Sequence, residues 1–171
     1  DKMITQVLVY LQSANQHTCQ FIDVDSLLRT LRTELSTPTE PLPVSGRGGM
    51  IYANGVLMHR CLQNLLANAQ AYDRDITIEV ERSSSGVTLR IKDRGPGIAQ
   101  PVLESVTDPF VRADTSRNDH SGGFGLGLSI AQRIAVSHKG SLALSNREGG
   151  GLTACVFFPF SEGDDQMFHT S

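Results

Sequence analysis

The sequence has 171 residues, of which 39% are hydrophobic, so it is long enough for one domain with a buried core and too short for two. The net charge is −3 and the 15 lysines and arginines are scattered, which excludes the basic surface that nucleic acid or an anionic membrane surface would require. Cys19, Cys61 and Cys155 are far apart and odd in number, which favours a reducing cytoplasm over a metal or disulfide framework. No apolar run is long enough to span a bilayer, so we expect no direct contact of this part with a membrane.

Hydrophobic periodicity predicts an alternation of helices and strands. Apolar residues three and four apart indicate the helices, and strict alternation indicates the strands. In chain order, the predicted elements are the end of a longer helix over residues 3–14, a strand over 21–24, a helix from an N-cap at Asp25 to residue 35, a strand over 50–53, a helix from about Val56, a hairpin of strands over 75–82 and 87–93, a short helix near 102–106, a helix over 125–138, and a final hairpin of strands over 141–146 and 152–160.

These elements predict an α/β fold, a two-layer sandwich in which a mixed sheet of about five strands packs on three helices. Residues 94–123 are rich in Gly, Pro, Asp and Ser, and a loop of this length is usually functional or disordered. We expect residues 1–16 to be a helix end and linker, residues 17–160 to be the domain, and residues 161–171 to be a disordered tail.

Two asparagines in the helix MHRCLQNLLANAQAY, Asn64 and Asn68, lie one turn apart on a face that the apolar stripe does not use. Asparagine is a poor residue for a helix interior, so the pair lowers helix propensity without contributing to the core. A role as ligands explains the pair. While the pair is considered alone, two solvated residues on an exposed face are the favoured explanation.

Two glycine-rich segments lie after these asparagines. In IKDRGPGI, a strand leads to Asp93, whose carboxylate can accept from the exocyclic amino group of a base, and Gly95 and Gly97 let the backbone approach a flat ring. In GGFGLGLSIAQRI, glycines lead into a helix start, where free N–H groups and the helix dipole favour phosphate. The spacing excludes a P-loop and a dinucleotide fingerprint.

The order of these features is what carries most information. An asparagine-bearing helix, the Asp-Gly-x-Gly turn, DPFVRAD and the Gly-x-Gly-Leu-Gly-Leu segment together resemble the four nucleotide-binding boxes of sensor histidine kinases, over about residues 24–160. The resemblance implies that family's ATP-binding fold, which is shared in outline with ATPase chaperones, mismatch-repair ATPases and type II topoisomerases. It also implies ATP and Mg²⁺ as cofactors and a long lid over the nucleotide.

The resemblance assigns roles position by position. Asn68 matches the magnesium ligand, with Asn64 as its polar neighbour, and Asp93 matches the aspartate that reads adenine. Arg112 and Arg117 flank the lid and are candidates to meet the triphosphate, or are merely solvated. The remaining nucleotide-binding positions that the resemblance implies are Tyr72, Gly95, Gly97, Ile98, Phe110, Gly123, Gly125, Leu126, Gly127, Leu128 and Thr153.

Two departures from the family's pattern bear on activity. Ala71 stands where a basic residue usually precedes Tyr72, so one expected phosphate contact is absent. None of the five histidines lies in a phosphoacceptor motif, so the resemblance implies an acceptor on a separate helical domain of the same parent. The five are His17, His59, His120, His138 and His169.

The sequence therefore predicts the catalytic ATP-binding fragment of a protein-histidine kinase, with the histidine-bearing dimerisation domain and a response regulator as partners. We expect a cytoplasmic domain of a parent that is an inner-membrane sensor. Related ATPases place a glutamate at the position of Asn64 to activate water, and an amide is no general base near neutral pH, so transfer is favoured over hydrolysis. An anti-sigma-type serine kinase and a nucleotide-binding regulatory module with little transfer activity stay open as alternatives.

Overall fold

A computed structural model describes residues 19–35, 42–73, 75–108 and 126–161 of the chain. The expectations for residues 1–16, and for residues 162–171 of the tail, lie outside these described residues. The elements, in chain order, are β1 (Gln20–Asp23), α2 (Val24–Leu35), β2 (Val44–Gly46), β3 (Met50–Ala53), α3 (Gly55–Tyr72), β4 (Thr77–Arg82), β5 (Gly86–Lys92), α4 (Gln100–Leu103), α5 (Gly127–Ser137), β6 (Ser141–Asn146) and β7 (Leu152–Pro159).

Five strands form one mixed sheet in the order β2-β4-β5-β7-β6. β2 pairs with β4 in parallel, and every other pair in this sheet is antiparallel. A second sheet of two strands joins β1 and β3 in antiparallel fashion. The predicted α/β class and the mixed sheet of about five strands are confirmed.

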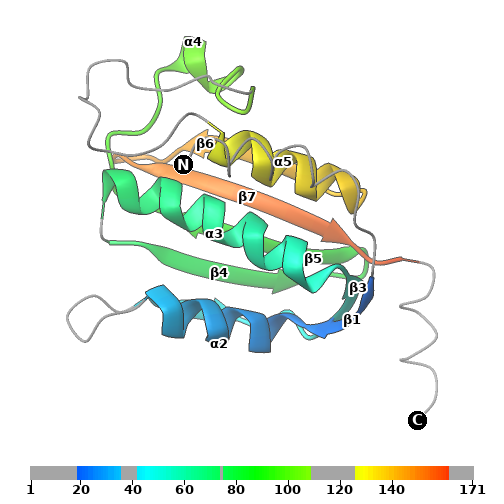
Figure 1. Ribbon diagram of the computed structural model, residues 1–171. Coiled ribbons are helices and arrows are strands. Elements are labelled where there is room, and N and C mark those ends of the chain that lie inside the picture. The colour runs from blue at the N-terminus through cyan, green and yellow to red at the C-terminus, as the bar shows by residue number, and fades with distance from the viewer. Residues whose placement is uncertain (1–18, 36–41, 74, 109–125, 162–171) are drawn as a thin grey trace, which may run out of the picture.

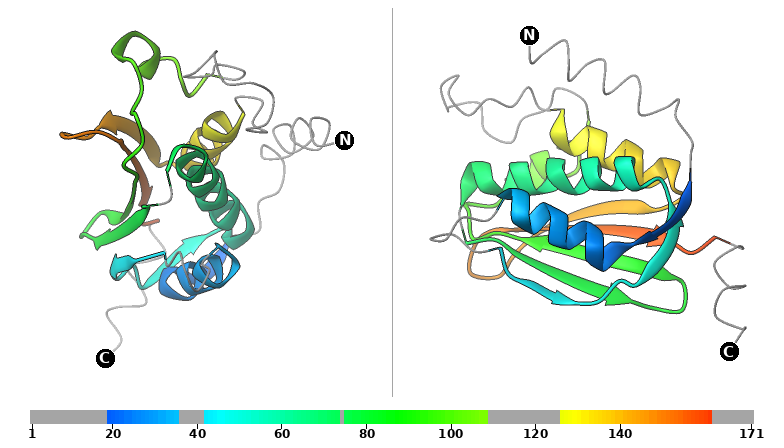
Figure 2. Two further views of the ribbon diagram at one scale, coloured as in Figure 1. Left: turned by 90° about the vertical axis from the view of Figure 1, so that its left-hand side faces the viewer. Right: turned by 60° about the horizontal axis from the view of Figure 1, so that its bottom comes forward.

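Helices α2, α3 and α5 cover one face of the large sheet and form the second layer, as Figure 1 and the left view of Figure 2 show. The strands β5 and β7 bury every second residue toward these helices, as expected for a sheet with one covered face. Short α4 lies apart from the two layers.

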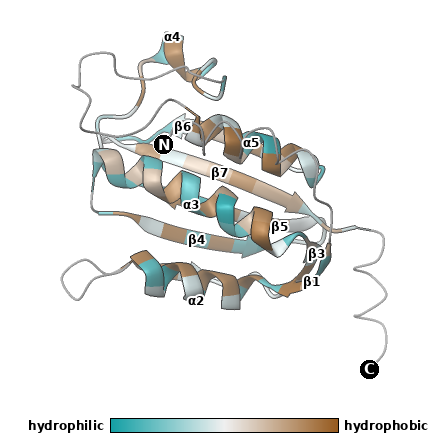
Figure 3. Cartoon of the chain, in the orientation of Figure 1, coloured by the Kyte–Doolittle hydropathy of each residue, from teal (hydrophilic) through white to brown (hydrophobic). Residues whose placement is uncertain are grey.

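The core lies between this face and the helices. Figure 3 shows hydrophobic residues interspersed with hydrophilic ones along α3 and α5, and the buried side chains of both helices pack together. The thiol of Cys61 in α3 donates to the carbonyl oxygen of Ala131 in α5 at 3.6 Å, and burial raises the pKa of this thiol to about 12. The α3–α5 contact therefore fixes the helix that carries the two asparagines.

Two local predictions were wrong, and a third was shifted along the chain. Val24 begins α2 instead of ending the preceding strand, and the cap is Asp23, whose Oδ1 accepts from the N–H of Asp25 at 3.0 Å. Asp25 instead accepts from the N–H groups of Gly48 at 2.9 Å and Gly49 at 3.2 Å, because the chain before β3 folds back onto the start of α2. The short helix near residues 102–106 lies at Gln100–Leu103, where a proline is tolerated in the first turn.

Candidate functional site

Asp93 directly follows β5, and only 4% of its surface is exposed. Its Oδ1 accepts two main-chain N–H groups, from Gly95 at 2.9 Å and from Leu152 at 3.1 Å. No group in the described part of the chain donates to Oδ2. A buried carboxylate oxygen without a donor is costly, so Oδ2 is available to accept an N–H group from a bound molecule.

The register of the sheet decides which side chains share the face of Asp93. Leu89 and Ile91 are buried on the helix-covered face, and Asp93 continues this alternation. Thr153 pairs with Lys92 and lies on the opposite face, while buried Leu152 stands beside Asp93. The structure thus does not bring Thr153 to this site, because a shift of one residue along a strand reverses the side-chain direction.

The turn after Asp93 packs against the end of α3. Gly97 has a φ of +73°, a backbone conformation that side chains rarely adopt. A Cβ atom on Gly95 would lie 2.8 Å from the Cβ of Tyr72, the last residue of α3, so no side chain fits between them. Ile98 turns back into the core, with 7% of its surface exposed. The structure therefore brings Tyr72, Asp93 and Gly95 together at one end of α3.

Two residues that sequence reasoning missed hold the same turn from the other side. The Nη1 of Arg147 donates to the main-chain oxygen of Asp93 at 2.6 Å. Asn146, the last residue of β6, makes two hydrogen bonds with the main chain of Ile98. The only signal in the sequence is an asparagine before a run of glycines, and nothing in that signal indicates a partner 48 positions away.

Asn64, Asn68 and Tyr72 form a row along α3 because they are four residues apart. The Nδ2 of Asn64 donates to the carbonyl oxygen of Arg60 at 2.9 Å, which leaves its Oδ1 without a donor in the described part of the chain. The side chain of half-buried Asn68 makes no hydrogen bond with any described residue. The row spans about 12 Å along the helix axis and offers two carboxamide groups for a ligand.

The N-terminus of α5 faces the other end of this row. α5 begins at Gly127 and no side chain of the described residues caps it, so the N–H groups of its first turn are available to an anion. A Cβ atom on Gly127 would lie 3.6 Å from the Oδ1 of Asn64. Leu126 and Leu128 are buried in the core, with 1% and 6% of their surfaces exposed, so only their main chain can meet a ligand.

Residues 109–123, which are half of the predicted loop over residues 94–123, lie outside the described residues. This holds for five predicted site residues, namely Phe110, Arg112, Arg117, Gly123 and Gly125. Ala71, the departure from the family's pattern, is exposed in the last turn of α3.

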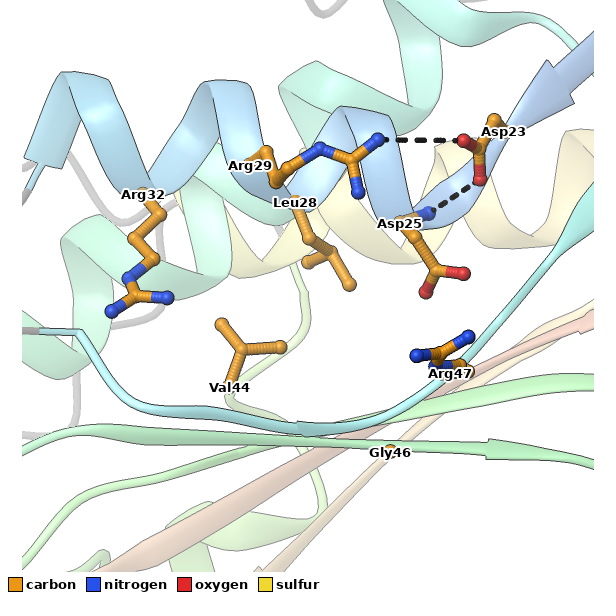
Figure 4. A pocket seen from close by; sticks show the side chains of 8 residues that line it. All are labelled: Asp23, Asp25, Leu28, Arg29, Arg32, Val44, Gly46 and Arg47. Carbon is orange, nitrogen blue, oxygen red and sulfur yellow. Dashed lines mark hydrogen bonds and ion pairs between the residues drawn. The ribbon is translucent and has the colours of Figure 1, made fainter.

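A hollow of about 620 Å³ lies elsewhere, between α2 and β2 (Figure 4). Both acidic residues of the hollow already have partners within the chain. Asp25 accepts a hydrogen bond from the N–H of Gly48, and Asp23 accepts one from the hydroxyl of Ser26 and forms an ion pair with Arg29 at 3.6 Å. The hydrogen bond from Ser26 holds the pKa of Asp23 below its ordinary value of 3.8. The hollow includes none of the predicted site residues and is lined by Asp23, Asp25, Leu28, Arg29, Arg32, Val44, Gly46 and Arg47.

The geometry around Asp93, α3 and α5 is that of a nucleotide-binding α/β domain, and comparison with known proteins agrees. Residues 53–162 match the family described as Histidine kinase-, DNA gyrase B-, and HSP90-like ATPase. The chain belongs to this family, and its relatives identify it as a bacterial two-component kinase catalytic domain of the histidine kinase type.

Two curated relatives illustrate the similarity. The chain is 36% identical to the sensor histidine kinase GtrS of Pseudomonas aeruginosa over 117 residues, which are 68% of the chain and 24% of the relative. It is 44% identical to the sensor protein RstB of Escherichia coli over 105 residues, which are 60% of the chain and 24% of the relative. The chain thus spans about a quarter of the length of these relatives.

Solved structures share the fold. Full-length ShkA in complex with AMPPNP superposes with a TM-score of 0.77 at 20% identity, over 94% of this chain and 35% of that one. The histidine kinase domain of the Escherichia coli osmosensor EnvZ gives a TM-score of 0.65 at 27% identity, over 86% of this chain and 92% of that one. In the part of the chain that the structure describes, no helix is long and apolar enough to cross a membrane.

Proposed function

We propose that this chain binds ATP with its base against Asp93 and its phosphates along α3 toward the N-terminus of α5. The observation that carries the proposal is the buried carboxylate of Asp93, in which two main-chain N–H groups hold Oδ1 and no described group donates to Oδ2. An exocyclic amino group such as that of adenine supplies the missing donor. Thr153 is left out of this site because it lies on the other face of the sheet.

The carboxamides on α3 fit a magnesium ion. Mg²⁺ prefers a few hard oxygen ligands together with phosphate oxygens and water. The side-chain oxygens of Asn64 and Asn68 have no donor in the described part of the chain, so they are available as such ligands. We assign Asn68 as the ligand and Asn64 as its neighbour, and the ion would neutralise charge on the phosphates.

The reaction that we propose is transfer of the γ-phosphoryl group to a histidine on a separate helical domain of the parent. The bond between the γ-phosphorus and the bridging oxygen breaks, ADP leaves, and a ring nitrogen of the acceptor forms the new bond in line. This chain binds and orients the nucleotide. The side-chain amide of Asn64 donates a hydrogen bond to the carbonyl oxygen of Arg60. An amide cannot take a proton from water near neutral pH, so little competing hydrolysis is expected.

The partners follow from this reaction. They are the histidine-bearing dimerisation domain and a response regulator, and the parent is an inner-membrane sensor with this domain in the cytoplasm. The sensor names of the relatives support these proposals. The relatives do not favour the serine-kinase or regulatory-module alternatives, and Ala71 alone is no positive evidence for either.

The test is to mix the purified chain with the helical domain of its parent and ATP labelled at the γ-phosphate. We expect label on the helical domain that is stable to base and lost in acid, as a phosphohistidine is, and no label when the chain carries Asp93→Asn. ATP binding without transfer to the helical domain would contradict the kinase proposal and favour a regulatory module. Absence of ATP binding would contradict the site itself.

A further inference from the structure

Asn146 makes a two-point contact with the loop that follows Asp93. Its Oδ1 accepts from the N–H of Ile98 at 2.8 Å, and its Nδ2 donates to the carbonyl oxygen of Ile98 at 2.7 Å. This is the pattern that a neighbouring strand would offer, although none of the described strands pairs with the loop. The side-chain amide supplies one donor and one acceptor side by side, so the two bonds also fix which way the amide points.

The contact is built into the sheet. Asn146 pairs with Leu152, and Leu152 in turn donates its N–H group to Asp93. The ends of β6, β7 and β5 therefore place Asn146 and Asp93 on either side of Leu152. A Cβ atom on Gly97 would lie 2.7 Å from the Oδ1 of Asn146, so the amide occupies the space that a side chain at position 97 would need.

The turn that follows Asn146 holds the start of the same loop. Arg147 donates to the main-chain oxygen of Asp93 at 2.6 Å, and its own main chain is bonded to Gly150 and Gly151 within the turn. Gly151 has a φ of +101°, and a Cβ atom there would lie 2.1 Å from that same oxygen of Asp93. The turn thus holds Asp93 at one end of the loop while Asn146 holds Ile98 at the other.

We propose that Asn146 is a positioning residue for the base of the bound nucleotide. It does not touch the nucleotide in this scheme. It keeps residues 95–98 in the one path that leaves the Oδ2 of Asp93 open and lets the glycine backbone lie against the base. The inference rests on the proposed nucleotide site and adds a residue from the β6–β7 hairpin to it.

The test compares Asn146→Ala with Ser145→Ala, a neighbour on β6 that is exposed on the opposite face. Each variant is titrated with ATP and GTP by calorimetry, since the two ligands share phosphates and differ in the base. Two hydrogen bonds are lost, so we expect ATP affinity to fall about tenfold and the preference for ATP over GTP to shrink by a similar factor in Asn146→Ala. Ser145→Ala should match the wild type, and amide exchange of Ile98 should quicken only in Asn146→Ala.

Asn146→Asp provides a second test, which can be made even if the alanine variant folds poorly. Its ionised carboxylate would face the carbonyl oxygen of Ile98, whereas the protonated form again offers one donor and one acceptor. The deficit in ATP affinity relative to the wild type should therefore shrink as the carboxyl group is protonated, in a pH series from about 7 to about 4.

The outcomes are separable. Equal loss of ATP and GTP affinity in Asn146→Ala, or ATP affinity within twofold of the wild type, would overturn the positioning role and leave the nucleotide site intact. No ATP binding by the wild type would overturn both. A deficit in Asn146→Asp that is independent of pH would also count against the two-point contact.

Discussion

Replacing Asp93 by asparagine tests the nucleotide site with little change to the fold. The side-chain oxygen of asparagine can still accept from the N–H groups of Gly95 and Leu152, so we expect the free energy of unfolding to change by less than about 1 kcal/mol. The group that replaces Oδ2 is an NH₂ donor. It would face the donor that adenine presents, which turns an attractive contact into an unsatisfied one.

The magnitude follows from these two losses. A hydrogen bond to a charged group contributes about 1.5–3 kcal/mol, and a buried donor left without an acceptor costs about 1–3 kcal/mol. Because the two overlap, we expect a net loss of about 2–4 kcal/mol, or about 30-fold to 1000-fold in the dissociation constant for ATP.

Calorimetric titration with ATP measures this loss, and urea unfolding measures the stability. Asp75→Asn is the matched control. Asp75 is an exposed carboxylate close to the same turn, and it forms an ion pair with Arg94 at 2.9 Å. It should leave ATP affinity within about twofold, as expected for an exposed ion pair. If Asp93→Asn bound ATP as tightly as the wild type does while remaining folded, the reasoning from the open Oδ2 would be refuted.

Three further predictions concern the rest of the site and the fold. Asn68→Ala should weaken binding of Mg-ATP at least about tenfold, an effect of about 1.4 kcal/mol. It should leave binding of ATP in EDTA unchanged, because it removes only the proposed metal ligand, and paired calorimetric titrations check this. Gly149→Ala should lower the free energy of unfolding, measured in urea, by about 1–2 kcal/mol because of its positive φ alone, since nothing lies within 4 Å of a Cβ atom there. Gly151→Ala should cost about 1–3 kcal/mol more, because its Cβ atom would lie 2.1 Å from the main-chain oxygen of Asp93. Asp23→Ala should lower the free energy of unfolding by about 1 kcal/mol at neutral pH. Because the folded-state pKa of Asp23 is depressed, this contribution is present above the ordinary pKa of 3.8 and should vanish as the pH falls through the lower folded-state pKa. A pH series of urea titrations on both proteins measures it.

Periodicity predicted the elements that are long enough to show it. The 18-residue helix α3 and the hairpin of β4 and β5 carry clear patterns, and both form near the predicted positions. β2 was missed because three residues after a proline-rich stretch are too few to show alternation. Its parallel pairing with β4 is a tertiary contact between segments that are distant in sequence.

Near neighbours in sequence could not be told apart where tertiary contacts decide their roles. Asp23 and Asp25 are equally suited to cap α2, and the N–H groups of Gly48 and Gly49 capture one of them. Leu152 and Thr153 differ by one position on a strand, and only the register of the sheet shows which one faces Asp93. In both cases the local chemistry is predictable and the choice between adjacent residues is not.

The two halves of the candidate site rest on different supports. The base side depends on the ends of β5, β6 and β7, because Asp93 is held by Leu152 and its loop by Asn146. The phosphate side depends on α3 and α5, whose buried faces pack together and set Asn64 opposite Gly127. A defect in the hairpin should therefore reduce base selectivity and spare the metal dependence, and a defect in α3 should do the reverse. The two halves meet at Tyr72, which ends the row on α3 and lies against Gly95.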